Sequence, residues 1–390
     1  MRYHSYLNSA RTIIESYKGD IPFAAFLKKC FNAHKKYGGK DRKQIATLCY
    51  DFYRLGKAVP QLPVEEKIIV AVFICETRSN DFLQFHKPEW NAIITKPVDE
   101  KIAIAGFTAE DVFPWAEALS DGVDAALFRY SFFTQPDLFL RIRPGNKETV
   151  MRKLQDAGIA FSMAGDDCLA LGNATKIDGV LDIDREVVIQ DVNSQQVLNF
   201  LKTSGIRHPA SSTKHPVSVW DCCAASGGKS ILAYDILEGQ IELTVSDIRE
   251  SILSNLSTRF DKAGIKNYRS FTADLSQQYS ILNQQYSIII CDAPCTGSGT
   301  WSRTPEQLYY LKRKTIDVYV AMQQQIVSHA IPHLQQGGTF IYITCSVFKN
   351  ENEDMVNFIK EKFHLQLLQM ELLKGYEKKA DSMFAAVFSK

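Results

Sequence analysis

The chain has 390 residues, of which 45% are hydrophobic and 23% are charged, and its formal net charge is +1. This composition is typical of a globular protein of two or three domains, and it excludes a strongly basic or acidic protein whose charge alone would name its partner. We find no apolar run of the roughly 20 residues that a membrane-spanning helix needs, and no signal peptide, so we expect no membrane association. The nine cysteines have no disulfide-scaffold spacing, which favours reduced thiols and a cytoplasmic location.

Residues 1–130 are predicted to form a helical domain. Apolar residues recur at three- and four-residue spacing over 9–17, 22–33 and 41–55. Between Lys28 and Lys57, nine Lys or Arg stand against two Asp, with three tyrosines among them. A basic helical surface dotted with aromatic residues is typical of a phosphate-binding face, although a solvated helix surface explains such a charge run equally well.

Residues 137–200 are predicted to form a small α/β subdomain. We expect a strand over 138–142, a turn over 144–146, a helix over 148–157 that Gly158 ends, and a strand over 186–190. The basic residues of this subdomain are Arg141, Arg143, Lys147, Arg152 and Lys153.

Residues 201–390 alternate between predicted strands and helices. The strands are expected at 217–223, 241–247, 268–273, 286–291, 339–344, 365–368 and 383–388. This alternation predicts an α/β fold with a mostly parallel sheet covered by helices on both faces.

A loop of small residues follows the first of these strands and opens a helix. A Gly-Gly turn by itself is a weak sign of a ligand site, because a simple strand–helix connection explains it as well. However, a carboxylate falls at the carboxyl end of each of four predicted strands: Asp221, Asp247, Asp274 and Asp292. Such a set suits a cationic ligand that carries a ribose and an adenine. A phosphate-binding loop is disfavoured, because Cys223 occupies the place of its first glycine.

Two cysteines lie just past the ends of predicted strands. Cys295 follows the fourth strand and Cys345 follows the fifth, so neighbouring strands would bring both to one cleft. A lone buried cysteine is more often a packing residue. Zinc bound by Cys222, Cys223, Cys291, Cys295 and Cys345 is the main chemical alternative, but no Cys-x-x-Cys pair occurs, so no metal site is expected.

Several of these stretches strongly resemble the Sun/Fmu family of RNA cytosine-5 methyltransferases, in particular its RsmB-like bacterial members, which modify small-subunit ribosomal RNA. The matching stretches are residues 188–195, 221–230, 246–248, 274, 292–299, 303–305, 344–346 and 381–387. The resemblance implies a Rossmann-like S-adenosylmethionine-dependent methyltransferase sheet in residues 201–390 and a small RRM-like α/β subdomain in residues 137–200. More weakly, it implies an N-terminal all-α, NusB-like RNA-binding domain in residues 1–130.

The resemblance also implies the role of each site residue. Cys345 would attack carbon 6 of the cytosine, Cys295 would assist removal of the carbon-5 proton and release of the product, and Asp292 would hold the edge of the base. Asp247 would bind the ribose of S-adenosylmethionine, Asp274 would bind its adenine, and Lys229 would help a thiol to ionise. The residues expected to bind S-adenosylmethionine are Cys223, Ala224, Ala225, Ser226, Gly227, Gly228, Lys229, Asp247, Arg249, Asp274 and Asp292.

The partner that the resemblance implies is RNA, ribosomal RNA first, with the basic residues of the first two domains on its backbone. We expect a monomer without a stable protein partner. Two alternatives remain. The protein could be a methyltransferase that acts on transfer RNA, or an RNA-binding ribosome assembly factor without catalytic turnover. One departure concerns Ser226, which stands where the family usually has proline. We expect it to loosen the cofactor loop.

Overall fold

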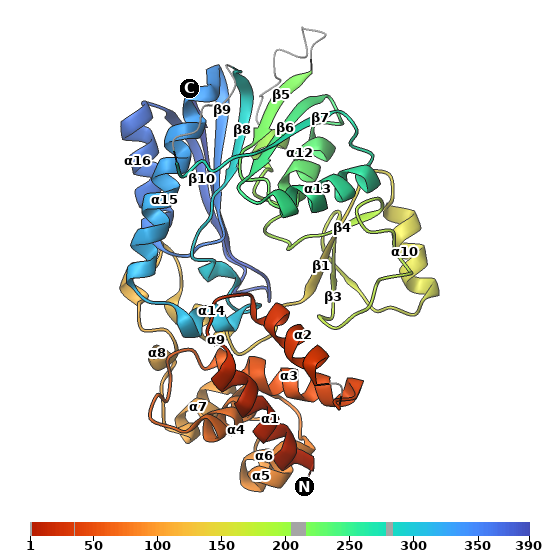
Figure 1. Ribbon diagram of the computed structural model, residues 1–390, viewed down its shortest axis with the longest axis vertical. Coiled ribbons are helices and arrows are strands. Elements are labelled where there is room, and N and C mark those ends of the chain that lie inside the picture. The colour runs from red at the N-terminus through yellow and green to blue at the C-terminus, as the bar shows by residue number, and fades with distance from the viewer. Residues whose placement is uncertain (1, 35, 204–215, 278–283) are drawn as a thin grey trace. The chain divides into compact units, whose positions relative to one another are not determined.

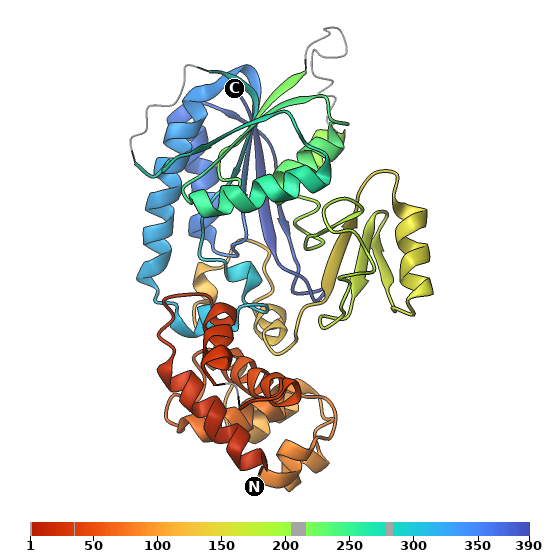
Figure 2. The same cartoon turned by 45° about the vertical axis from the view of Figure 1, so that its right-hand side comes forward.

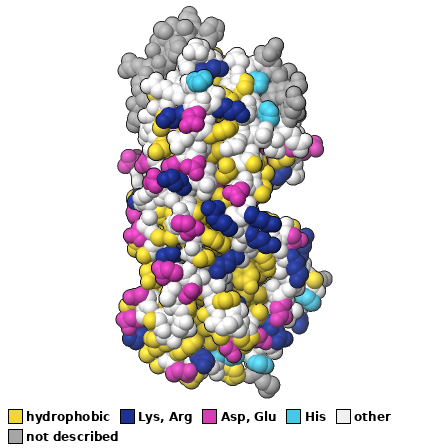
Figure 3. Space-filling model, turned by 90° about the vertical axis from the view of Figure 1, so that its left-hand side faces the viewer, with side chains coloured by type: hydrophobic (Ala, Val, Ile, Leu, Met, Phe, Trp, Pro, Cys, Tyr) yellow, Lys and Arg dark blue, Asp and Glu magenta, His cyan; other side chains and the backbone are white. Residues whose placement is uncertain are grey.

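The computed structural model describes residues 2–34, 36–203, 216–277 and 284–390. It divides into two compact units, Met1–Gln135 with Thr300–Lys312 (unit 1) and Pro136–Gly299 with Arg313–Lys390 (unit 2). No helix within the described ranges is long and apolar enough to cross a membrane. On the face of the molecule in Figure 3, Lys and Arg side chains lie among Asp and Glu side chains, in keeping with the small net charge.

Unit 1 is built from helices. They are α1 (Arg2–Ser16), α2 (Phe23–Ala33), α3 (Gly39–Arg54), α4 (Val64–Cys75), α5 (Asp81–His86), α6 (Pro88–Ala92), α7 (Val98–Ala105), α8 (Ala109–Val112), α9 (Ala125–Ser131), α14 (Pro305–Tyr310) and the 3-10 turn η1 (Ala116–Ala118). The first three cover the ranges in which apolar periodicity predicts helices. In α3, Ile45, Leu48, Cys49 and Phe52 are buried, which gives the three- and four-residue spacing of one helix face.

The segment 300–312 belongs to unit 1 although it lies in the sequence of the C-terminal half. Tyr310 Oη donates to the Tyr17 carbonyl at 2.8 Å. Gly19 has a φ of +76°, and a Cβ there would lie 2.8 Å from the Tyr310 ring. Local sequence patterns do not predict this packing, because it joins residues almost 300 positions apart.

The basic segment of unit 1 is only partly a surface feature. Lys28, Lys29, Lys36, Lys40 and Lys43 are exposed, and Lys35 lies outside the described residues. In contrast, Arg54 is buried and donates to the Phe132 carbonyl at 2.6 Å, and Lys57 donates to the Leu311 carbonyl at 2.9 Å. These two cations therefore do not belong to the predicted basic surface, because they bond backbone carbonyls inside the unit.

The main sheet of unit 2 has seven strands in the order β10-β11-β9-β8-β5-β6-β7. They are β5 (Val217–Asp221), β6 (Ile241–Asp247), β7 (Tyr268–Thr272), β8 (Tyr286–Asp292), β9 (Leu334–Thr344), β10 (Gln366–Leu373) and β11 (Met383–Ser389). Strands β5 to β9 pair in parallel, and β11 runs antiparallel between β9 and β10. The predicted α/β fold with a mostly parallel sheet is confirmed.

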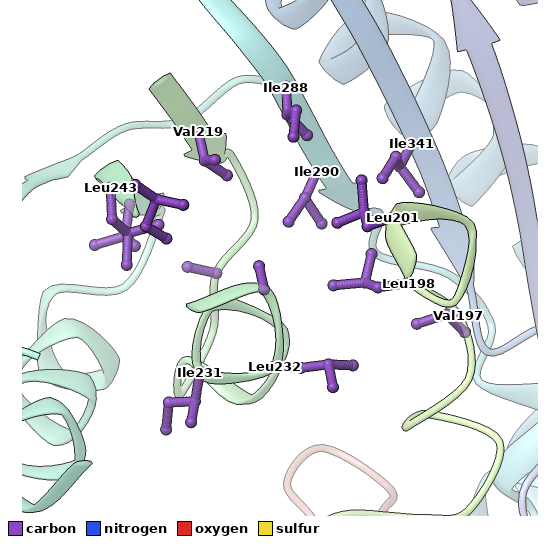
Figure 4. Close-up of a cluster of buried hydrophobic side chains, with 14 of the residues drawn as sticks. Val197, Leu198, Leu201, Val219, Ile231, Leu232, Leu243, Ile288, Ile290 and Ile341 are labelled. Atoms are coloured by element: carbon purple, nitrogen blue, oxygen red, sulfur yellow. The ribbon is translucent and has the colours of Figure 1, made fainter. Parts of the chain in front are cut away.

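Helices cover both faces of this sheet, as Figures 1 and 2 show. Helices α12 (Gly228–Ile236) and α13 (Glu250–Ala263) lie on one face, and α15 (Lys314–Ala330) and α16 (Glu353–Phe363) lie on the other. In β8, Ile288 and Ile290 face the first pair of helices and Ile289 and Cys291 face the second, as the two-residue period of a strand requires. Figure 4 shows part of the first core. The remaining short elements are α11 (Phe200–Thr203), η3 (Ser298–Thr300), η4 (Ile331–His333) and η5 (Lys349–Glu351).

A second, antiparallel sheet in unit 2 has the order β2-β3-β1-β4. One helix lies between β1 and β2 in the sequence. The elements are β1 (Leu138–Ile142), α10 (Lys147–Asp156), β2 (Ser162–Gly165), β3 (Cys168–Leu171) and β4 (Val187–Ile189). Arg141 and Arg143 form ion pairs with Asp235 of α12 at 2.6 and 2.7 Å, and all three side chains are at most 10% exposed. These two arginines therefore attach the small sheet to α12, and the expectation that they contact RNA is wrong.

Candidate active site

The order of the main sheet reverses at β5, which pairs with β6 on one side and with β8 on the other. Ligands of doubly wound sheets bind at such a switch point, beyond the carboxyl ends of the strands. Asp221 ends β5 and is fully buried, and its Oδ2 accepts a hydrogen bond of 2.6 Å from Ser230 Oγ. Burial raises the pKa of Asp221 to about 7. This carboxyl therefore fixes the start of α12 from inside the protein.

The loop after β5 turns so tightly that one of its glycines is required. Gly227 has a φ of +84°, and a Cβ at this position would lie 2.7 Å from Phe260 Cε1. The loop is tied to β6 because Ala224 N donates to the Ser246 carbonyl at 2.9 Å. The bare backbone at residue 227 thus packs against α13 and brings the loop close to the switch point.

Ser226 is held firmly in this loop. Arg259 Nη1 donates to the Ser226 carbonyl at 2.9 Å and to Ser226 Oγ at 3.0 Å. Arg259 also pairs with buried Asp184 at 2.7 Å. The expected loosening of the loop by Ser226 is therefore wrong, because the hydroxyl has an arginine partner that a sequence pattern does not reveal.

The carboxylates after β6 and β7 are organised by local hydrogen bonds. Asp247 Oδ2 accepts from Ala225 N at 3.0 Å, and Asp247 Oδ1 accepts from Arg249 Nε at 3.0 Å. Asp274 Oδ1 accepts from Ser276 Oγ at 2.6 Å. Arg249, which the sequence analysis places in the cofactor site, is therefore a partner of the Asp247 carboxylate in this structure.

Lys229 and Asp292 form an ion pair at the centre of the site, 2.8 Å apart. Burial by itself lowers the pKa of Lys229, but the Asp292 carboxylate and the nearby Cys345 and Asp221 outweigh it, so the pKa is raised overall. Lys229 is thus a fixed positive charge beside Asp292 at the centre of the site.

Cys295 and Cys345 lie side by side, with their Sγ atoms 3.4 Å apart. Strands β8 and β9 pair in parallel with Asp292 opposite Ile343, so the two cysteines come from adjoining loops. The Cys345 thiol and burial raise the pKa of Cys295 well above its ordinary value. Cys295 therefore holds its proton at neutral pH.

A buried carboxylate that the sequence analysis does not single out joins these two loops. Glu351 accepts hydrogen bonds from Thr296 N at 2.8 Å, Thr296 Oγ1 at 2.6 Å, Ser346 Oγ at 2.5 Å and Gln323 Nε2 at 3.2 Å. Burial raises its pKa above the ordinary value of 4.5, although these bonds act in the opposite direction. Because Thr296 follows Cys295 and Ser346 follows Cys345, Glu351 fixes the loops of both cysteines.

A glycine sets the distance between the same loops. Gly299 N donates to the Cys345 carbonyl at 2.8 Å, and Ser382 N donates to the Gly299 carbonyl at 2.9 Å. A Cβ on Gly299 would lie 2.2 Å from the Ser382 carbonyl oxygen. The backbones of the two loops can approach this closely only because residue 299 has no side chain.

This sheet, with acidic strand ends around a glycine-containing loop at its switch point, is a Rossmann-like α/β sheet. The solved structures agree. The crystal structure of PH0851 superposes with a TM-score of 0.71 at 17% identity, covering 100% of this chain and 98% of that chain. A methyltransferase homologue from Pyrococcus horikoshii gives a TM-score of 0.58 at 20% identity, covering 75% and 98%.

Residues 211–387 match the family model of the 16S rRNA methyltransferases RsmB/F. Curated relatives include ribosomal RNA small subunit methyltransferase B of Escherichia coli O157:H7, 26% identical over 56% of this chain and 49% of the relative. The enzyme of the same name from Citrobacter koseri is 28% identical over 57% and 50%. The aligned part of the chain thus spans about half the length of these relatives. Residues 211–387 are thus similar to the RsmB/F methyltransferases.

Proposed function

We propose that the protein transfers a methyl group from S-adenosylmethionine to carbon 5 of a cytosine in small-subunit ribosomal RNA. The observation that carries this proposal is the 3.4 Å separation of the Cys295 and Cys345 sulfurs beside the Lys229–Asp292 ion pair. The choice of RNA rests on the names of the relatives, which are small-subunit ribosomal RNA methyltransferases.

The residues at the switch point fit S-adenosylmethionine. Asp247 and Asp274 supply acceptors at successive strand ends for ribose hydroxyls and an adenine amine, and the carboxylates suit the positive charge of the cofactor. Residues 223–229 supply the backbone cradle, in which Gly227 leaves no room for a side chain. The cofactor, when bound, supplies an electrophilic methyl group.

Cys345 is the nucleophile of the proposed reaction. Carbon 5 of cytosine is a poor nucleophile, and addition of the Cys345 thiolate to carbon 6 turns the ring into an enamine that can accept a methyl group at carbon 5. Lys229, the cation of the ion pair with Asp292, supplies the positive charge that favours a thiolate nucleophile in this site. Asp292, held by Lys229, accepts a hydrogen bond from the edge of the base. The base leaves its stack to reach these groups.

Cys295 acts after the adduct has formed. In the free enzyme its pKa is raised, and the neighbouring Cys345 sulfur is the first cause. When Cys345 becomes a thioether, its sulfur is a weaker hydrogen-bond acceptor and carries no charge, so both contributions of Cys345 to the raised pKa of Cys295 fall and Cys295 ionises more readily. The Cys295 thiolate then takes the proton from carbon 5, and elimination of the Cys345 sulfur releases the methylated base. The order of the two steps thus follows from the coupling of the two thiols.

Two single substitutions test this assignment. Cys345→Ala should abolish transfer of radiolabelled methyl groups to ribosomal RNA. Cys295→Ala should form the adduct and fail to resolve it, so that a band of protein bound to RNA persists on a denaturing gel. Cys168→Ala, which removes a buried thiol of the small sheet, serves as the matched control. Robust methyl transfer by the Cys345 variant would refute the proposed nucleophile.

A further inference from the structure

Three other cysteines of unit 2 meet at the ends of β5 and β8. Cys222 and Cys223 follow β5, and Cys291 lies on β8. Their Sγ atoms all lie within 4.8 Å of one another. The backbone fixes this arrangement, because Cys222 N donates to the Ile290 carbonyl at 2.9 Å across the two strands. The cluster is separate from the catalytic pair Cys295 and Cys345, and only the backbone of Cys223 belongs to the proposed cofactor cradle.

The spacing of the three sulfurs is close to that of a metal site. A metal–thiolate bond of about 2.3 Å places three ligands roughly 4 Å apart around one ion. The observed spacing of at most 4.8 Å therefore needs a contraction of less than about 1 Å, which side-chain rotation supplies. Cys222 and Cys291 are 1% and 0% exposed, whereas Cys223 is half-buried and opens a path to the cluster.

The donor set decides which ion fits. Structural zinc sites are closed by four protein ligands. Among the residues that the structure describes, the group of possible donors here comprises the three thiols, without a His, Asp or Glu as fourth member. Thiolate ligands select soft ions, of which Cu(I) accepts three-coordinate sites. We propose that Cys222, Cys223 and Cys291 form a three-thiolate site for Cu(I).

Such a site would act on the cofactor loop. Cys223 is the first residue of the loop expected to bind S-adenosylmethionine, and Cys291 directly precedes Asp292. An ion bound by both would hold the loop after β5 to the end of β8. The site is separate from the catalytic pair, and its existence does not depend on methyl transfer.

The test measures Cu(I) binding by the full chain under anaerobic conditions. Cys295→Ser and Cys345→Ser are introduced together, so that the neighbouring pair of thiols cannot bind the ion. Cu(I) is supplied as the coloured complex of a Cu(I) chelator, and loss of colour reports its transfer to the protein. Mutation of a residue that supports the ligands of a metal typically lowers metal affinity by about 10–100-fold, and loss of a ligand itself should cost more. In the background without Cys295 and Cys345, Cys291→Ser should therefore weaken Cu(I) binding by at least about 100-fold. Cys49→Ser, which changes a buried thiol of unit 1, should leave the affinity unchanged.

The expected result is one Cu(I) per chain, with X-ray absorption showing three sulfur neighbours at about 2.3 Å. Circular dichroism checks the fold of each variant, and Cys223→Ser, at the half-buried position, replaces Cys291→Ser if that variant unfolds. Unchanged Cu(I) affinity in the folded ligand variants, or two sulfur neighbours only, would overturn the proposal. Tighter binding of Zn²⁺ than of Cu(I) would overturn the choice of ion.

Discussion

Replacing Glu351 by alanine should destabilise unit 2 and disable the active site together. The carboxylate accepts four hydrogen bonds, two from Thr296 and one each from Ser346 and Gln323. A buried donor left without an acceptor costs about 1–3 kcal/mol, and breaking a buried network by removing one partner typically costs about 3–5 kcal/mol in total. We therefore expect Glu351→Ala to lower the free energy of unfolding by roughly 3–5 kcal/mol.

Glu351→Gln keeps the size and shape of this side chain but removes its negative charge, so it separates the effect of the charge from that of packing. The amide keeps one acceptor, and the hydroxyls of Thr296 and Ser346 can rotate to accept from its NH₂ group, so we expect a loss of about 1–2 kcal/mol. Because the pKa of Glu351 is raised in the folded state, its contribution to wild-type stability is fully present below pH 4.5 and is lost as the pH rises through the folded-state pKa. The amide does not titrate, so the stability difference between wild type and Glu351→Gln should shrink as the pH rises.

Urea unfolding, followed by tryptophan fluorescence and by circular dichroism, measures the free energies of unfolding. The rate of single-turnover methyl transfer at saturating cofactor measures the activity of the site. The alanine variant should lose rate even under conditions in which it is fully folded, because the loops of Cys295 and Cys345 lose their common anchor. Glu361→Ala, at an exposed position of α16, is the control. An alanine variant within about 0.5 kcal/mol of wild type, the range of ordinary surface substitutions, would refute the reasoning.

Two further substitutions test other parts of the structure. Gly227→Ala forces a Cβ to within 2.7 Å of Phe260 at a φ of +84°, so it should lower stability by about 1–3 kcal/mol in thermal unfolding. Gly228→Ala, where a Cβ meets nothing within 4 Å, should fold like wild type, and equal stability of the two variants would contradict the packing account. Asp235→Ala leaves two buried arginines without their carboxylate and should cost about 3–5 kcal/mol. The exposed pair formed by Asp182 should contribute less than about 1 kcal/mol, and a similar loss in Asp182→Ala would contradict this ranking.

The sequence predicts the main sheet well because each strand can be recognised from its own residues. Short apolar runs that end in an acidic or small residue predict β6 to the residue and β5, β7 and β8 to within two residues. The carboxylates and cysteines of the site are predicted for the same reason, since the carboxyl ends of parallel strands must meet at one edge.

The features that the sequence analysis misses all depend on partners far away in the chain. The Ser226 hydroxyl is bonded by Arg259, and no local pattern distinguishes this serine from a flexible one. Likewise, Arg141 contributes to a basic composition, but its partner is Asp235, 94 residues later. A charged residue at a strand position that is expected to be buried is the one local signal of such an ion pair. Charged side chains are rarely buried unless they are paired.

Trapping the reaction intermediate tests the central claim most directly. Ribosomal RNA that contains 5-fluorocytidine is incubated with the full chain and S-adenosylmethionine, and the product is digested and mapped by peptide mass spectrometry. Because fluorine cannot leave carbon 5 as a proton does, the adduct cannot resolve. The structure predicts a modified nucleotide on the peptide that contains Cys345, whereas a nucleotide on Cys295, or methylated RNA without any protein adduct, would contradict the account.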